Sequence, residues 1–134
     1  MSAMLHERLD RIDQELSTLE TEVGTHEADA LAALLEQAIS LVARTMRAWI
    51  EAEGKLAPPP DADVLEVWKV LVKGDPTWNA IRDNCRELVY YRNCLALGRA
   101  DALPPVPQRM AVRTARHIFL YVRSRAQRAA DASR

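Results

Sequence analysis

Proline occurs at only three places in this chain, and this leaves long stretches that nothing interrupts. The seven prolines form clusters at residues 58–60 and 104–107, with Pro76 alone between them, and only four glycines are present. The remaining stretches are rich in Ala, Leu, Glu and Arg, which favour helix. No segment alternates apolar and polar residues with the period of two that a strand requires. The sequence therefore predicts an all-α fold, a bundle of four or five helices.

Apolar periodicity and helix-breaking residues set the expected limits of these helices. Gly24 and Thr25 indicate a break and an N-cap, and Asp75 followed by Pro76 has the pattern of a helix start. The predicted helices span residues 5–23, 31–54, 61 or 63 to 74, 75–98 and 107–129. A chain of 134 residues has the size of one domain. We expect a single domain over 1–134, with a heptad helix at 1–24, central helices at 25–98, and a loop and basic helix at 99–134.

The first helix carries a narrow apolar stripe. Apolar residues recur at spacings of four and three along it, at Leu5, Leu9, Ile12, Leu16, Leu19 and Val23. Two apolar residues per heptad are typical of a coiled-coil seam, whereas a helix in a monomeric bundle buries a wider face. We therefore expect the first five of these residues to take part in self-association, as a homo-oligomer or in a larger complex. The pattern alone leaves open whether the seam packs inside its own bundle.

Charge is divided sharply along the chain. Residues 1–66 hold 5 Lys and Arg against 14 Asp and Glu, while residues 67–134 hold 13 against 5. Such asymmetry indicates either two halves that attract each other, within or between chains, or a basic surface that meets phosphate.

The last predicted helix holds the clearest basic feature. Arg109, Arg113, Arg116 and Arg123 fall within about 80° of one another on its helical wheel, and Arg99 precedes them. We call these five residues the basic ridge. Guanidinium groups at helical spacing can follow a nucleic-acid backbone without reading bases. The alternative is that they pair with the acidic first helix or form a solvated face.

Arginine also lies on an apolar face of the fourth predicted helix. Its neighbours on that face are Trp78, Ile81, Cys85, Leu88, Val89, Leu95 and Ala96. A guanidinium in a dry interior is costly, so Arg92 must find a carboxylate or carbonyl partner or lie where the bundle opens to water. Tyr90 and Tyr91 of this helix could stack on a base, as could Trp78, although packing is the commoner role of such rings.

The segment from Arg92 to Gly98 resembles the HEPN superfamily, whose motif is an arginine, usually a polar residue next, and a histidine four to six residues on. Arg92 and Asn93 match this motif, and Leu97 stands where the histidine would be. The resemblance implies a HEPN-like bundle. Active members are metal-independent ribonucleases, commonly dimers, found as toxins, antiphage effectors and parts of CRISPR nucleases, and inactive members bind nucleic acid or partner proteins.

Loss of the histidine argues against catalysis, because leucine cannot exchange protons near neutral pH. His117 could replace it from the last helix, but its wheel position beside Met110 and Tyr121 predicts a hydrogen-bonded core residue instead. His6 and His26 are expected to be solvated. The favoured function is non-catalytic binding of nucleic-acid backbone, RNA rather than DNA, or of a partner protein. The alternatives are a subunit of a CRISPR-type ribonucleoprotein, a ribonuclease toxin completed by another histidine, and a protein-only adaptor.

Other classes of function lack sequence support. Cys85 and Cys94 are nine residues apart on one helix, so they cannot pair, and with three histidines they form no metal motif. There is no phosphate-binding glycine loop, and no hydrolase or zinc-protease motif. No apolar run is long enough to span a bilayer, and the first residues do not resemble a signal peptide. We expect a cytoplasmic protein with no cofactor, no metal and no small-molecule substrate.

Overall fold

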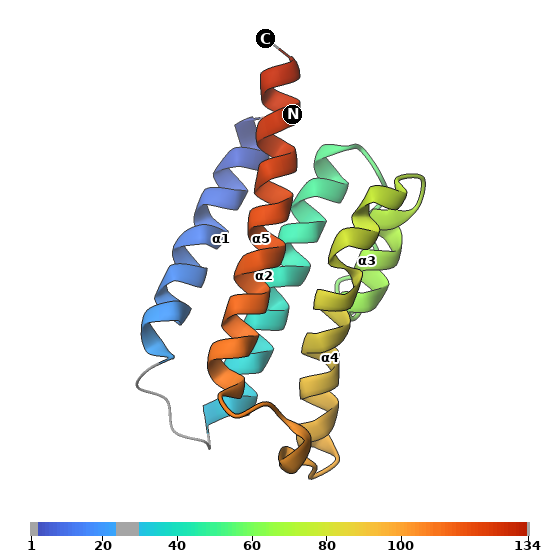
Figure 1. The fold of residues 1–134 in the computed structure, drawn as a ribbon. Helices are drawn as coiled ribbons and strands as arrows, with labels where there is room; N and C mark the ends of the chain where they lie inside the picture. The colour runs from blue at the N-terminus through green and yellow to red at the C-terminus, as the bar shows by residue number, and fades with distance from the viewer. Residues whose placement is uncertain (1–2, 24–29, 134) are drawn as a thin grey trace.

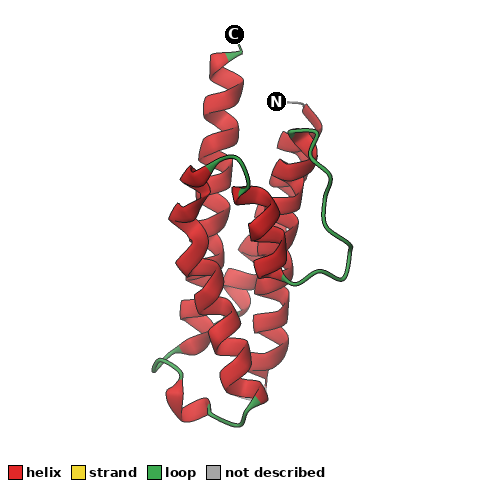
Figure 2. Cartoon of the chain, turned by 90° about the vertical axis from the view of Figure 1, so that its right-hand side faces the viewer, coloured by secondary structure: helices red, strands yellow, loops and turns green. Residues whose placement is uncertain are grey.

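The computed structural model describes residues 3–23 and 30–133, and this part of the chain is helical without any strand. The five α-helices and two short 3-10 helices are α1 (Ala3–Glu22), α2 (Leu31–Ala52), α3 (Val64–Val72), η2 (Pro76–Ile81), α4 (Arg82–Ala96), η3 (Ala100–Ala102) and α5 (Pro107–Ala132). The predicted all-α bundle is confirmed (Figure 1; Figure 2). The predicted break at Gly24 and Thr25, together with His26 and Arg134, lies outside the described residues.

Helix α2 is the centre of the bundle. It packs against α1, α3, α4 and α5, which surround it in Figure 1. Twelve of its 22 residues are buried, among them Met46 and Ile50. A helix with neighbours on several sides needs this wide apolar face, because an exposed apolar side would leave surface in contact with water.

Helices begin and end within about three residues of the predicted positions, with one larger difference. Gly54, Gly74 and Gly98 have positive φ angles of 76°, 85° and 68°, the left-handed conformation that follows a helix end. Asp75 begins the next element as predicted, since its carboxylate accepts from the backbone N–H of Thr77. However, the first six residues after Asp75 form the 3-10 helix η2, and the α-helix begins only at Arg82. The prediction of one continuous helix from residue 75 is therefore wrong.

The apolar seam of α1 packs inside the chain's own bundle. Helix α1 contacts both α2 and α5. The seam side chains are at most 2% exposed: Leu5, Leu9, Ile12, Leu16 and Leu19. These five side chains are buried within the chain and do not form an exposed surface that a second chain could contact. This corrects our expectation that they take part in self-association. Helices α2 and α5 cover this narrow seam, so a coiled-coil spacing here marks the edge of the chain's own core.

Candidate functional site

Carboxylates of α1 neutralise the middle of the basic ridge. The guanidinium of Arg116 donates to Asp13 (2.5 Å), Glu20 (2.7 Å) and Ser17 (3.1 Å). Arg123 donates to the other oxygen of Asp13 at 3.0 Å. Hydrogen bonding from Arg116 lowers the pKa of Asp13, and Arg123 adds to this shift. Two of the five ridge arginines are therefore used within the fold, which is the alternative that the sequence left open.

A ring contact fixes the same two arginines further. Their guanidinium carbons lie 5.3 Å (Arg116) and 5.2 Å (Arg123) from the ring centroid of Phe119, which is buried. Guanidinium groups favour the face of an aromatic ring. Only 17% of the Arg116 side chain remains exposed. Both arginines connect α1 to α5, and Arg116 is the more deeply covered of the two, since 43% of the Arg123 side chain is exposed.

The first two arginines of α5 have a different environment. Arg109 and Arg113 are exposed, and within the part of the chain that the structure describes neither forms an ion pair. Together with Arg116 they line a hollow of about 330 Å³, whose remaining lining residues are Glu20, Val23 and Val112. This hollow lies where the end of α1 meets the beginning of α5. Three of the six residues that line it are arginines of the basic ridge.

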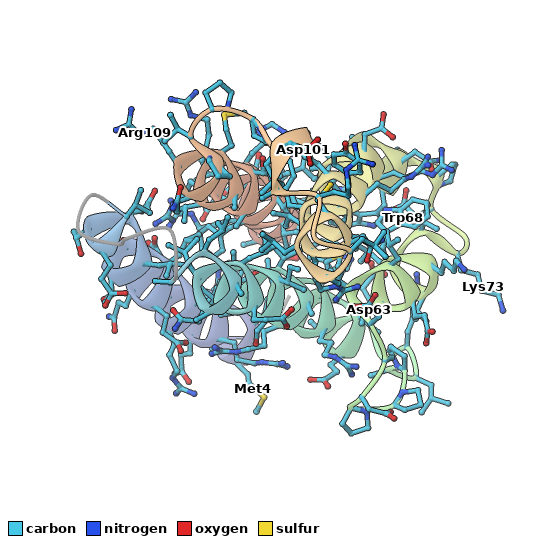
Figure 3. The ribbon with its side chains drawn as sticks, turned by 90° about the horizontal axis from the view of Figure 1, so that it is seen from below. Met4, Asp63, Trp68, Lys73, Asp101 and Arg109 are labelled. Atoms are coloured by element: carbon cyan, nitrogen blue, oxygen red, sulfur yellow. The ribbon has the colours of Figure 1, made fainter. Side chains whose placement is uncertain are left out.

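Arg99 lies at the same end of the bundle. It donates to Asp101 at 3.1 Å, and the two side chains are 63% and 70% exposed. An ion pair this exposed contributes little stability, so a stronger anion can displace the carboxylate. Figure 3 shows Asp101 and Arg109 on the same side of the molecule, seen from the end where α4 finishes and α5 begins. Arg99, Arg109 and Arg113 are the ridge residues that remain available to a partner, and we call them the free basic face.

Arg92 finds its partner on a loop. Both of its terminal nitrogens donate to the Asp63 carboxylate, at 2.8 and 2.7 Å, in the bidentate geometry that makes such pairs strong. Asp63 immediately precedes α3, and the guanidinium of Arg92 lowers the pKa of its carboxyl. The sequence correctly required a partner for Arg92, but it could not identify this one, which is separated from it by 29 residues.

No histidine or cysteine is among the residues that line the hollow at Arg92. Its volume is about 290 Å³, and Glu36, Ser40, Arg44, Arg47 and Asp61 are among its lining residues. Arg44 is paired with Glu15, and Arg47 donates to the carbonyls of Pro58 and Pro59. The arginines at this hollow therefore already have partners within the fold.

The motif residues do not form one site. Arg92 is directed toward Asp63, whereas Asn93 is exposed and Leu97, the C-cap of α4, is 76% exposed. His117 is also exposed, so the expectation of a core histidine is wrong. Its wheel neighbours Met110 and Tyr121 are only half-buried, because that edge of α5 turns toward water. A helical wheel of α5 could not show that His117 is exposed, since the width of the buried face depends on how the neighbouring helices pack.

Sequence reasoning missed the cluster around Arg125. This side chain donates to Thr77 Oγ1 (2.7 Å) and Asp75 (2.9 Å), and its guanidinium lies 4.4 Å from the Trp78 ring centroid. Trp78 is fully buried and also packs edge-on against Trp49. The cluster attaches η2 to α5 and serves the fold. Its signal in the sequence was an arginine about two turns before the end of α5, and the other arginines nearby concealed it.

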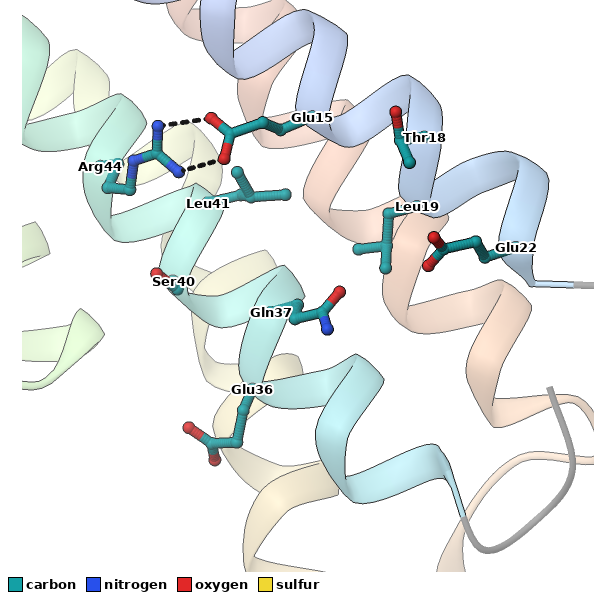
Figure 4. A pocket seen from close by; sticks show the side chains of 9 residues that line it. All are labelled: Glu15, Thr18, Leu19, Glu22, Glu36, Gln37, Ser40, Leu41 and Arg44. Atoms are coloured by element: carbon teal, nitrogen blue, oxygen red, sulfur yellow. Dashed lines mark hydrogen bonds and ion pairs between the residues drawn. The ribbon is translucent and has the colours of Figure 1, made fainter.

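A groove between α1 and α2 is the most spacious hollow described here, at about 610 Å³ (Figure 4). Leu19 and Leu41 form its apolar part, and polar side chains of both helices surround them. Glu15 and Arg44 close one end through a two-fold hydrogen bond of 3.0 and 2.5 Å, and this lowers the pKa of Glu15. No histidine or cysteine is among the residues that line this groove.

The two cysteines are buried thiols, as expected. Burial raises the pKa of Cys85 to about 12, so its thiol stays protonated and unreactive at neutral pH. In residues 3–23 and 30–133 no three metal-ligating side chains come together. No helix within these ranges has the length and apolar character to cross a membrane.

Comparison with known proteins adds no relative. No family model, no curated protein and no solved structure matches this chain. Its function must be argued from its own residues.

Proposed function

We propose that this protein is a non-catalytic helical module that binds the phosphate backbone of nucleic acid through its free basic face, Arg99, Arg109 and Arg113. One observation carries the proposal. The acidic helix α1 pairs with Arg116 and Arg123 but leaves Arg109 and Arg113 exposed beside a hollow. Exposed arginines at helical spacing suit phosphates, because each phosphate that they neutralise releases bound counterions.

The pairing of Arg92 supports a role without catalysis. Its guanidinium already binds the Asp63 carboxylate, so a phosphate would have to compete with a bidentate ion pair. Neither Leu97 nor the residues lining the Arg92 hollow supply an imidazole for proton transfer. The HEPN-like relationship remains part of this proposal, in the form of a member that binds and does not cleave. RNA is the expected ligand on that basis.

The test compares charge reversals at the two ends of α5. Arg109→Glu with Arg113→Glu should weaken binding of fluorescent RNA roughly tenfold or more and should lower the salt dependence of the affinity. Arg128→Glu is the matched control, since Arg128 is exposed on the same helix, about 22 Å from Arg113 along its axis. It should change the affinity by less than about twofold.

Far-UV circular dichroism and urea unfolding should be alike in both variants and the wild type, because all three arginines are exposed. Equal losses in the two variants would show that net charge, and not this face, drives association. Absence of binding at low salt by the wild type would overturn the proposal.

A further inference from the structure

Two adjacent tyrosines on α4 have opposite environments. Tyr91 is 6% exposed and donates its hydroxyl to Glu87, so it belongs to the core. Tyr90 is 51% exposed and lies on the outer side of the helix, with its ring centroid 6.3 Å from that of Tyr91. A large ring left half in water gives up the stabilisation that burial would supply. The fold therefore uses Tyr91 and leaves the Tyr90 ring free.

Arginine predominates among the charged residues in the part of the chain around Tyr90. Between residues 84 and 120 the chain holds six arginines and two carboxylates. Two of these arginines are directed inward to ion pairs, and the other four are exposed: Arg86, Arg99, Arg109 and Arg113. The Tyr90 hydroxyl lies near the Cys94 side chain, which raises its pKa. Of the charged groups around it, Arg99 acts to lower this pKa and Asp101 acts to raise it. The ring thus lies beside a residue of the free basic face.

The two helices that carry these residues lie next to each other. Helices α4 and α5 are in contact and run in opposite directions, and the chain reverses at the end of the bundle where Asp101 and Arg109 lie (Figure 1; Figure 3). Tyr90 is less than two turns from the end of α4, and Arg109 and Arg113 are in the first two turns of α5. The exposed ring and the free basic face therefore belong to the same end of the molecule.

We infer that Tyr90 is a stacking platform for an unpaired base, so that the preferred ligand of this surface is single-stranded nucleic acid. The inference rests on the proposed function and deepens it. Basic side chains follow a backbone of either form, but a ring on a convex helix surface can stack only on a base whose face is open. In a duplex the neighbouring base pairs cover those faces. Backbone contacts from arginine and one stacked base together favour a single strand over a duplex.

The occupant that competes with a base is an acidic protein segment. Leu97 and Val106, 76% and 44% exposed, lie near the same end and are aliphatic, which suits a protein surface better than a base. The positive charge of this surface suits both a nucleic-acid strand and an acidic protein segment. The planar ring of Tyr90, exposed beside arginine, favours the base, and the experiment separates the two.

The experiment measures fluorescence anisotropy with a labelled oligouridylate and with an RNA duplex of the same length. Wild-type protein should prefer the single strand. Tyr90→Ala should weaken single-strand binding roughly fivefold or more and leave duplex binding unchanged, because only a stacked base is lost. Tyr90→Phe keeps the ring and should retain the preference. Met4→Ala is the control, since Met4 is 67% exposed on α1 and lies on the opposite side of the molecule in Figure 3.

The outcomes distinguish this inference from the proposed function. If Arg113→Glu weakens binding but Tyr90→Ala does not, or if Tyr90→Ala weakens single-strand and duplex binding equally, the stacking role is overturned and backbone binding stands. If the wild type binds neither RNA, both proposals fall. A Leu97→Ser variant, which removes the apolar side chain without adding charge, supports a base as the occupant if its single-strand affinity is unchanged. A loss equal to that of Tyr90→Ala assigns the surface to apolar docking and overturns the inference.

Discussion

Arg92 and Asp63 form a bidentate ion pair between α4 and the loop before α3. The arginine lies late on α4, the aspartate precedes α3, and two hydrogen bonds of 2.8 and 2.7 Å join them. Their side chains are 29% and 41% exposed, so water screens the pair only in part. Two parallel hydrogen bonds between charged groups are stronger and more directional than a single surface contact. The pair therefore fixes the loop before α3 against the side of α4.

A double-mutant cycle should detect this pairing. Arg92→Ala and Asp63→Ala should each lower the free energy of unfolding, and the double variant should lose less than their sum, with a coupling energy of about 1 kcal/mol. Urea unfolding followed by circular dichroism measures all four proteins. Arg92→Ala should also bind RNA as the wild type does, because its guanidinium is engaged by Asp63.

Additive losses in that cycle would mean that the ion pair does not exist in solution. Cleavage of single-stranded RNA in EDTA that depends on Arg92 would restore a catalytic role to this position.

At the scale of elements, α1 is an integral part of the core. Its five seam residues are at most 2% exposed and face α2 and α5. Arg116 and Arg123 of α5 hold its acidic side through Asp13. Apolar burial accounts for the larger share of the stabilisation, since a buried leucine contributes about 1.5–3 kcal/mol and a partly exposed ion pair about 1 kcal/mol or less.

Substitutions along the seam should therefore unfold the protein and not merely separate chains. Leu9→Ala and Leu16→Ala, each at a side chain that is 1% exposed, should each lower the free energy of unfolding by about 2–5 kcal/mol. Met4→Ala, on the exposed side of the same helix, should change it by less than about 0.5 kcal/mol. Urea unfolding measures the difference. An Ile12→Asp variant that stays folded and sediments as a smaller species would instead place the seam between chains.

The elements also show which parts of the structure the sequence could predict. The ends of the helices could be predicted well from the sequence. Proline, glycine and N-cap residues such as Asp75 mark these ends, because their effect on the backbone is confined to one or two turns. The packing of α1 could not be predicted, since the same apolar spacing occurs at the edge of a core and at an interface between chains. The exposure of His117 could not be predicted either, because the width of the buried face of α5 depends on the neighbouring helices. The ion pair of Arg92 with Asp63 also needed tertiary structure, because the loop that carries Asp63 has no periodic pattern.

For the whole molecule, ion pairs within the fold use part of the charge division along the sequence. Ion pairs join the acidic first half to the basic second half through Asp13, Glu20 and Asp63. Asp13 and Glu20 hold Arg116 and Arg123 of the ridge, while Arg109 and Arg113 form no ion pair within the residues that the structure describes. An overall charge of −1 therefore coexists with a local basic surface. Association with a polyanion would depend on this local field, and so on ionic strength.

The same ion pairs predict how stability depends on pH. Arginine partners lower the pKa of Asp13, Glu15 and Asp63, and hydrogen bonds from Thr77 and then Arg125 lower that of Asp75. A carboxyl whose pKa is lower in the folded protein stabilises the fold above its unfolded pKa, about 4, and loses this contribution as the pH falls through the folded value. The urea midpoint should therefore be level near pH 7 and should fall steadily below about pH 4.

Asp13 should account for a separable part of this fall, because its carboxylate holds two arginines of α5. Asp13→Asn should lower the midpoint at pH 7 and reduce the further loss on acidification, since the amide has no proton to gain in this range. Asp10→Asn is the matched control on the same helix, because Asp10 is exposed and within the described residues forms no ion pair. Its pH profile should follow the wild type. Parallel profiles for Asp13→Asn and the wild type would show that the α1 to α5 ion pairs do not form in solution, and that α1 is held to α5 by its apolar seam alone.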